Sequence, residues 1–207
     1  MRSKIGVVSM LLVLWGSAPV TAQTYDQLRK WCYGDATNDQ TIQGCDAIIK
    51  SGRETPLMQA AAFSSRGVAY ENKGQYDLAI QDYSQAIKLN PYHANAFANR
   101  CGARAIVGQL QAALADCNES LRLRPNDAST LDSRGFTYLK LGQFDAAIAD
   151  YDSALRIDPK KPYSLFGRGV ARRKKGDLAG GGADIAAAKA IKSDIAEVFA
   201  KFGLKDF

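Results

Sequence analysis

The sequence predicts an all-α solenoid built from stacked helical hairpins. Its central part repeats with a period of 34 residues, and four series of residues keep this step. The series are Arg66, Arg100, Arg134 and Arg168; Gly74, Gly108, Gly142 and Gly176; Asp82, Asp116, Asp150 and Asp184; and Pro91, Pro125 and Pro159. A period of this length indicates that each repeat packs on its neighbours and leaves an extended groove for another chain.

Residues 1–22 have the pattern of a secretory signal peptide. Arg2 and Lys4 give a basic start, a short apolar stretch follows, and Val20–Ala22 supplies small residues for cleavage before Gln23. The apolar stretch is too short to span a bilayer, which disfavours the alternative of a retained membrane anchor. We therefore expect an exported, soluble protein in the periplasm or outside the cell, without stable membrane insertion.

The first clear repeat, residues 60–93, contains two expected helices separated by Gly74. That glycine stands where the end of a helix requires a left-handed backbone, which glycine adopts without strain. The second helix has a wide apolar stripe, and Pro91 ends it because proline cannot continue the hydrogen-bond ladder. The same pattern predicts three further repeats, at residues 94–127, 128–161 and 162–195. Small residues recur where paired helices come closest, namely Ala79, Ala113, Ala147 and Gly181.

Small and aromatic residues occupy fixed places within the repeats. In the first copy these are Gly67, Tyr70, Ala79, Tyr83, Ala86 and Pro91, and in the third Gly135, Tyr138, Ala147, Tyr151, Ala154 and Pro159. This pattern resembles the tetratricopeptide repeat family over residues 60–195. The second and fourth copies depart from it, with Arg104 and Arg172 in place of the first tyrosine. The resemblance implies a right-handed superhelix of antiparallel helix pairs with a concave binding face.

The two ends of the chain are expected to complete the stack. Residues 23–59 read as a degenerate hairpin whose first helix is Tyr25–Tyr33 and whose second aligns Cys45 with Tyr83. At the other end, residues 194–207 are expected to form a capping helix, with Ser193 as its N-cap. Its apolar side chains would face the last repeat, as a terminal cap requires. These side chains are Ile195, Val198, Phe199 and Phe202.

The four cysteines fit two local disulfides. Cys101 and Cys117 lie 16 residues apart and take places expected to face each other across a hairpin, while Cys32 and Cys45 lie 13 apart across the degenerate one. Export permits disulfides, and of the three possible connectivities only the local pairing suits the repeat geometry. The alternatives are buried free thiols, a redox couple or a metal site. The last two are disfavoured because the sequence has neither a Cys-x-x-Cys motif nor a nearby histidine.

Two interpretations fit the repeated arginines and aspartates, which lie 16 residues apart within each copy. The arginines could line a groove that binds carboxylates or phosphates, or they could pair with the aspartates along the stack. Repetition in every copy favours the second interpretation, because a binding site rarely needs the same residue four times. We expect exposed pairs worth about 0–1 kcal/mol each.

Specificity is expected on the first helices, at places where the four copies differ. The C-terminal half offers Tyr163 and Phe166 beside cations, and Asp132 takes the place of Phe166 one repeat earlier. Aromatic and arginine side chains dominate interface energies, and positive charge favours an acidic protein or peptide partner. The expected cations are Arg172, Arg173 and Lys174. Asn99 matches one residue of the clamp by which some tetratricopeptide domains hold a C-terminal carboxylate, but the cationic members are missing.

Two other functions are alternatives to protein binding in the groove. Seven cations between Lys160 and Lys175 either form a solvated helix end or contact an anionic polymer of the cell envelope. An enzyme is disfavoured because the only histidine, His93, falls in a turn and no nucleophile elbow, phosphate loop or metal-ligand spacing occurs. We expect no catalytic residue, cofactor or metal. The net charge, +6 or +4 without the leader, does not indicate nucleic-acid binding.

Overall fold

The computed structural model describes residues 23–205, so the predicted signal peptide lies outside the described residues. Within this range the chain forms eleven helices and no strand, which confirms the predicted all-α class. The helices are α1 (Tyr25–Tyr33), α2 (Asn38–Ser51), α3 (Pro56–Asn72), α4 (Tyr76–Leu89), α5 (Ala94–Ile106), α6 (Leu110–Leu123), α7 (Ala128–Lys140), α8 (Phe144–Ile157), α9 (Pro162–Lys174), α10 (Leu178–Ile191) and α11 (Ile195–Lys201).

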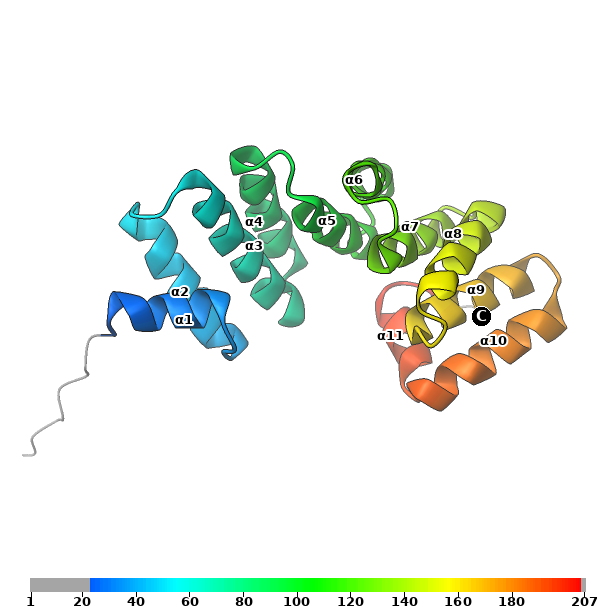
Figure 1. Ribbon diagram of the computed structural model, residues 1–207. Helices are drawn as coiled ribbons and strands as arrows, with labels where there is room; N and C mark the ends of the chain where they lie inside the picture. The colour runs from blue at the N-terminus through cyan, green and yellow to red at the C-terminus, as the bar shows by residue number, and fades with distance from the viewer. Residues whose placement is uncertain (1–22, 206–207) are drawn as a thin grey trace, which may run out of the picture.

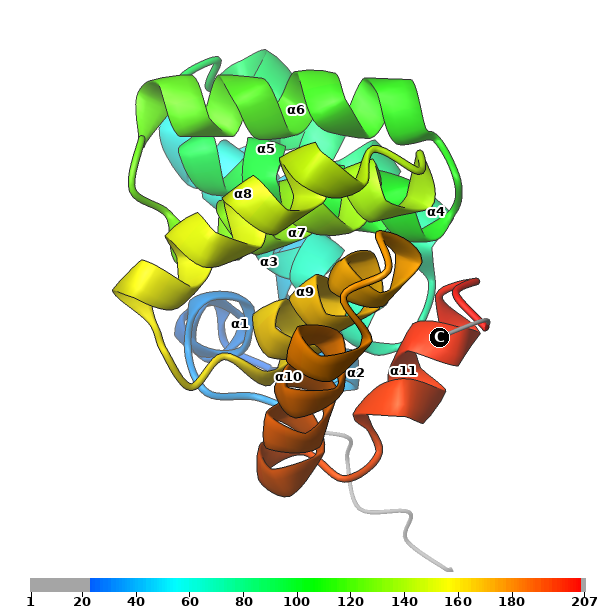
Figure 2. The same ribbon diagram turned by 90° about the vertical axis from the view of Figure 1, so that its right-hand side faces the viewer.

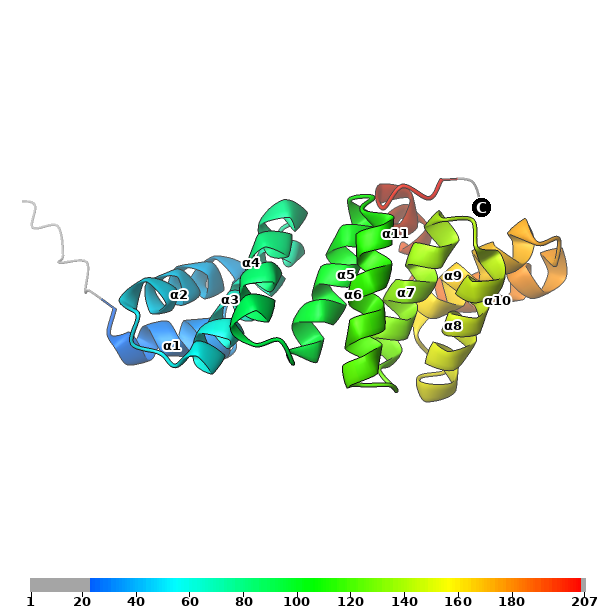
Figure 3. The same cartoon turned by 90° about the horizontal axis from the view of Figure 1, so that it is seen from above.

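Five helical hairpins, α1–α2 to α9–α10, stack in an arched row (Figures 1 and 3). The first helices of successive hairpins contact one another, α3 with α5, α5 with α7 and α7 with α9. The second helices from α4 to α10 make no such contacts among themselves in the described part. The first helices therefore form the inner, more tightly curved layer of a superhelical solenoid. None of the helices in residues 23–205 has the length and apolar character needed to cross a membrane.

The turns within the four repeats each depend on the predicted glycine. Gly74, Gly108, Gly142 and Gly176 have φ values of 73°, 88°, 73° and 92°, in the left-handed region that glycine adopts most readily. The start of α3 differs from the sequence expectation, because this helix begins at Pro56 rather than at residue 60. Thr55 caps it by accepting a hydrogen bond from the Met58 amide, and proline at the first helical position loses no helix hydrogen bond.

One disulfide occupies a position that the first and third repeats fill with a glycine and a tyrosine. A Cβ atom added to Gly67 would lie 2.7 Å from Cε1 of Tyr83, so the tyrosine ring rests directly on the glycine. In the second repeat the same place holds Cys101 and Cys117, which are disulfide-bonded with their Cα atoms 5.4 Å apart. A second disulfide joins Cys32 to Cys45, with Cα atoms 4.6 Å apart. Both predicted pairings are confirmed.

The arginine–aspartate ladder is present, but it is buried rather than exposed. Each arginine donates two hydrogen bonds of 2.6–2.8 Å to the aspartate 16 residues later. The arginine side chains are 14–23% exposed and the aspartates 5–9%. The expectation that these pairs are exposed is therefore wrong, and removing one partner would leave a buried charge unpaired.

The ladder also ties each hairpin to the one before it, which the sequence did not predict. The remaining guanidinium nitrogen, Nη1, donates to a side chain on the preceding second helix. The acceptors, in chain order, are Asp46, Ser84, Asn118 and Asp152. Each arginine thus fastens three helices. The contact from Arg66 to Asp46 extends this pattern to the degenerate hairpin.

Helix α11 does more than cap the last repeat. Its N-cap is Asp194 rather than Ser193, and it lies against the inner side of the C-terminal hairpins (Figures 1 and 2). Besides α9 and α10 it reaches α7, where the ring of Phe199 packs edge-on against Phe136 with centroids 5.7 Å apart. Lys140 of α7 donates a hydrogen bond of 3.1 Å to the carbonyl oxygen of Phe202. The C-terminal part of the concave face is therefore occupied by the chain itself.

Candidate binding pocket on the concave face

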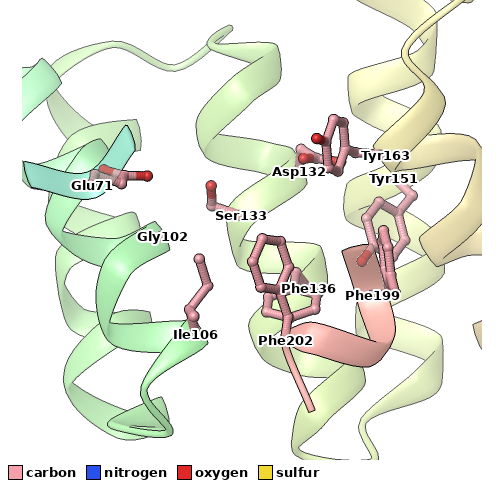
Figure 4. Close-up of a pocket in the computed structure, with 10 residues that line it drawn as sticks. All are labelled: Glu71, Gly102, Ile106, Asp132, Ser133, Phe136, Tyr151, Tyr163, Phe199 and Phe202. Atoms are coloured by element: carbon pink, nitrogen blue, oxygen red, sulfur yellow. The ribbon is translucent and has the colours of Figure 1, made fainter. Parts of the chain in front are cut away.

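A pocket of about 240 Å³ opens on the concave face where α11 meets the first helices (Figure 4). Glu71 of α3, Gly102 of α5 and Ser133 of α7 contribute to its wall, so the pocket spans successive repeats. Tyr163 of α9 and Phe199 of α11 contribute from the C-terminal side. Because it joins the inner helices of several hairpins, the pocket depends on the stacking of α3, α5, α7 and α9.

Aromatic rings form the C-terminal wall of the pocket. Phe199 stacks on Tyr163 with centroids 6.3 Å apart and an interplanar angle of 29°. The ring of Phe202 meets Phe136 edge-on, with centroids 6.1 Å apart. Such offset and edge-to-face arrangements are favourable and hold the rings in fixed orientations. The wall is therefore a rigid apolar surface, built in part by the C-terminal helix.

Two carboxylates supply the charge of the pocket. Asp132 is partly buried and accepts a hydrogen bond of 2.6 Å from the Ser164 hydroxyl. Burial raises the pKa of Asp132 to about 6, opposed by this hydrogen bond and by the positive charge of Lys161. Glu71 accepts a hydrogen bond of 2.8 Å from the Tyr83 hydroxyl, and burial raises its pKa as well. No lysine or arginine is among the described residues that line the pocket, so it is negative at neutral pH.

The hydroxyl group of Tyr151, which also lines the pocket, has no hydrogen-bond partner among the described residues although its side chain is 0% exposed. Its counterpart Tyr83 is satisfied by Glu71 and has Asn99 within hydrogen-bonding reach. Around Tyr151 these two places hold Leu139 in the same repeat and Gly167 in the next, and neither offers a polar side chain. A buried hydroxyl without a partner costs about 1–3 kcal/mol, so this one calls for a functional explanation.

Comparisons with known proteins agree with this architecture. Models of the tetratricopeptide repeat match residues 60–93 and 103–164. The chain belongs to the tetratricopeptide repeat (TPR) family. No curated protein sequence matches this chain.

Several solved TPR structures share the fold. MamA from Desulfovibrio magneticus RS-1, from residue 41 to its end, has a TM-score of 0.68 at 18% identity, covering 82% of this chain and 94% of that one. TTC0263 from Thermus thermophilus has a TM-score of 0.62 at 18% identity, covering 80% and 89%. The first TPR of Spaghetti (RPAP3), bound to the HSP90 peptide SRMEEVD, has a TM-score of 0.55 at 24% identity, covering 62% and 99%. The TPR fold supports a role as a scaffold for protein interactions.

The TPR stack brings together only some of the residues predicted to bind a partner. Asp132 and Tyr163 both line the pocket. Phe166 is buried away from any bound protein segment, because its side chain is 1% exposed and packs on Phe199 with ring centroids 4.7 Å apart. That prediction is wrong, since it did not foresee that α11 would cover this side of α9. Asn99 instead lies beside the Tyr83 hydroxyl.

The predicted cations lie away from the aromatic residues of the TPR groove. Tyr163 is at the N-terminal end of α9 and Arg173 is ten residues further, about 15 Å along the helix axis. Arg172 forms an ion pair of 2.9 Å with Asp184, while Arg173 and Lys174 are exposed. The expectation that aromatic and cationic side chains act side by side is therefore wrong.

Three of the seven cations of the basic cluster already form ion pairs within the TPR stack. Arg168 forms ion pairs with Asp152 and Asp184, and Lys175 pairs with Asp145. These contacts weaken the alternative that the cluster binds an anionic polymer, because paired cations attract a polyanion less strongly.

Sequence reasoning missed Glu71, Tyr151 and Phe136 as pocket residues. A signal for the first two was present, because the two places that satisfy Tyr83 hold Leu139 and Gly167 around Tyr151. Phe136 gave no comparable signal, since its role depends on contact with α11. A TPR pattern therefore identifies variable positions better than it identifies the surfaces they form.

Replacing Asp132 by asparagine is expected to stabilise the protein near neutral pH. The folded-state pKa of about 6 exceeds the ordinary value of 3.8, so wild-type stability decreases as the pH rises between these values. Asparagine keeps the acceptor for Ser164 but removes the buried charge. The gain should be roughly 1–3 kcal/mol at about pH 7.5 and should vanish at about pH 3.5. Thermal unfolding of both proteins at each pH measures it, and equal melting temperatures at the higher pH would contradict the prediction.

Proposed function

We propose that this protein is an exported scaffold that binds a segment of another protein in its concave pocket. The observation that carries the proposal is the pocket itself, which combines a fixed aromatic wall with partly buried polar groups. Binding sites of this composition hold a ligand by apolar contact and orient it by a few polar groups. The placement of the pocket on the inner layer, where several repeats meet, suits an extended or helical segment.

Two observations support export. The disulfides Cys32–Cys45 and Cys101–Cys117 lie in the core, with all four side chains 0–2% exposed. Structural disulfides persist in oxidising compartments and are rare in the cytosol. The basic, apolar and small-residue pattern of residues 1–22 points to the same compartment. On this proposal the partner is another protein of the cell envelope or the extracellular space.

Filling the pocket at Gly102 should weaken binding at least about tenfold without unfolding the protein. A Cβ atom at Gly102 would meet only the Ser133 hydroxyl, at 3.6 Å, so Gly102→Trp can place its ring in the groove. Gly182 of α10 is a matched control, because a Cβ atom there would meet nothing within 4 Å. Both substitutions replace a helical glycine and should not lower the melting temperature.

Peptides selected from a random displayed library on the purified wild-type protein provide the measurement. They should bind wild type and Gly182→Trp alike and lose at least about tenfold in affinity for Gly102→Trp, the scale of a lost central contact. Undiminished binding to a folded Gly102→Trp protein would show that the concave pocket is not the binding site.

A further inference from the structure

We infer that the pocket accepts a cationic side chain, a lysine or an arginine, carried by the bound protein segment. The inference rests on the proposed function and names the chemistry of the partner. It reverses the expectation of an acidic partner, because the cations that suggested one lie at the far end of α9. The groups that do line the pocket are carboxylates, a buried hydroxyl and aromatic rings.

Charge complementarity is the first argument. Asp132 and Glu71 place two carboxylates in the pocket wall, and no cation is among the described residues that line it. The nearby lysines are held elsewhere. Lys161 donates to the Ser129 hydroxyl, and Lys140 donates to the carbonyl oxygens of Ala105, Ile106 and Phe202. Apart from the charge of Lys161, no cation of residues 23–205 therefore balances the pocket carboxylates, and we expect the bound segment to supply one.

The Tyr151 hydroxyl is the second, independent argument. It is fully buried, it lines the pocket, and it has no partner among the described residues. Burial and the nearby charge of Asp132 both raise its pKa, so the hydroxyl stays protonated and its oxygen can accept a hydrogen bond. An ammonium or guanidinium group beside Asp132 could donate to this oxygen and to the carboxylate together. The hydroxyl would gain a partner that the described residues do not supply, and the carboxylate would gain a second donor besides Ser164.

The aromatic wall is the third argument, because ring faces attract desolvated cations. The protein already uses this contact nearby. The Nζ atom of Lys140 lies 5.5 Å from the ring centroid of Phe136 while it donates to backbone carbonyls. Tyr163 and Phe199 present further rings to the pocket. A cation that enters the pocket would meet carboxylate, hydroxyl and ring faces, as the ammonium of Lys140 meets carbonyls and a ring.

The first test sequences the peptides selected from the library and counts their basic residues. Lysine and arginine should be enriched among peptides that Gly102→Trp no longer binds. One such peptide, labelled with a fluorophore, is then compared with the same peptide carrying norleucine in place of its lysine, or citrulline in place of its arginine. Either neutral version should bind at least about tenfold more weakly, because it keeps the apolar stem and loses the charge.

Substitutions in the protein test the same contact between the cationic side chain and the pocket. Asp132→Asn should weaken the basic peptide at least about tenfold, and Tyr151→Phe by a smaller factor, because a neutral acceptor is lost. Neither variant should alter the affinity of the neutral peptide. Asp145→Asn, an exposed carboxylate outside this pocket, is the matched control and should bind like wild type.

The pH dependence gives a further readout. Affinity for the basic peptide should be full well above pH 6 and fall as the pH drops through about 6, because Asp132 becomes protonated. The other ionisable groups around Asp132 are Glu71 on α3, Lys140 on α7, Tyr151 on α8, and Lys161 and Tyr163 at the start of α9. In Asp132→Asn most of this dependence should disappear, and what is left would report on Glu71.

The outcomes separate the two proposals. Peptides that depend on Gly102 but carry no basic residue, or that bind Asp132→Asn as tightly as wild type, would overturn the cationic specificity and leave the groove function standing. Peptides that bind Gly102→Trp undiminished would overturn the groove function itself.

Discussion

Alanine in place of Arg134 is expected to destabilise the fold by about 3–5 kcal/mol. Arg134 donates two hydrogen bonds of 2.7 Å to Asp150, whose side chain is 9% exposed. It also donates one of 2.8 Å to Asn118 on the preceding hairpin. The substitution leaves a buried carboxylate without its partner and removes the link between three helices. Few single changes outside the apolar core should have a larger effect.

Urea unfolding, followed by circular dichroism at 222 nm as a conventional helix signal, measures the loss. The control is Arg122→Ala, which breaks the exposed pair with Glu119 and should change stability by less than about 1 kcal/mol. A second variant, Arg134→Met with Asp150→Leu, removes both charges and should recover much of the loss, because no unpaired charge remains. Equal destabilisation by Arg134→Ala and Arg122→Ala would refute a structural role for the ladder.

Loss of the Cys101–Cys117 disulfide is expected to have the second-largest effect. Serine at both positions should lower the free energy of unfolding by about 3 kcal/mol, because the open chain regains the entropy that closure of this loop removes. Two hydroxyl groups would also replace sulfur atoms in a place that is 0% exposed. The change should therefore weaken the centre of the stack without altering the pocket residues.

A second double variant, with glycine at position 101 and tyrosine at position 117, separates the effect of the cross-link from the effect of lost side-chain volume. In the first repeat Gly67 and Tyr83 fill the same place, with the ring resting on the glycine. Cys101→Gly with Cys117→Tyr removes the cross-link but supplies matching volume, so it should be more stable than the double serine variant. Peptide mapping without reduction should first recover both native disulfides. Crossed linkages, or a double serine variant as stable as wild type, would contradict the prediction.

The sequence by itself determined the class of fold, the number of helices and the disulfide pairing. These features follow from local or strictly periodic physics. Gly74 adopts a left-handed backbone that other residues avoid, and Pro91 cannot continue a helix. Cys101 and Cys117 occupy a place whose facing partners are visible in other repeats. Because each copy repeats the same constraint, the four repeats give independent evidence for the same local structure.

Only the tertiary structure decided how the ladder is buried and where α11 lies. The sequence shows that Phe199 and Phe202 belong to an apolar face, but such a face fits the end of the stack as well as the inner groove. The choice depends on contacts with Phe136 and Lys140, which lie about sixty residues earlier in the chain. The resulting position of α11 buries Phe166 and completes the pocket. Periodicity specifies how neighbouring repeats pack, whereas a helix that appears once has no repeated partner from which its position can be inferred.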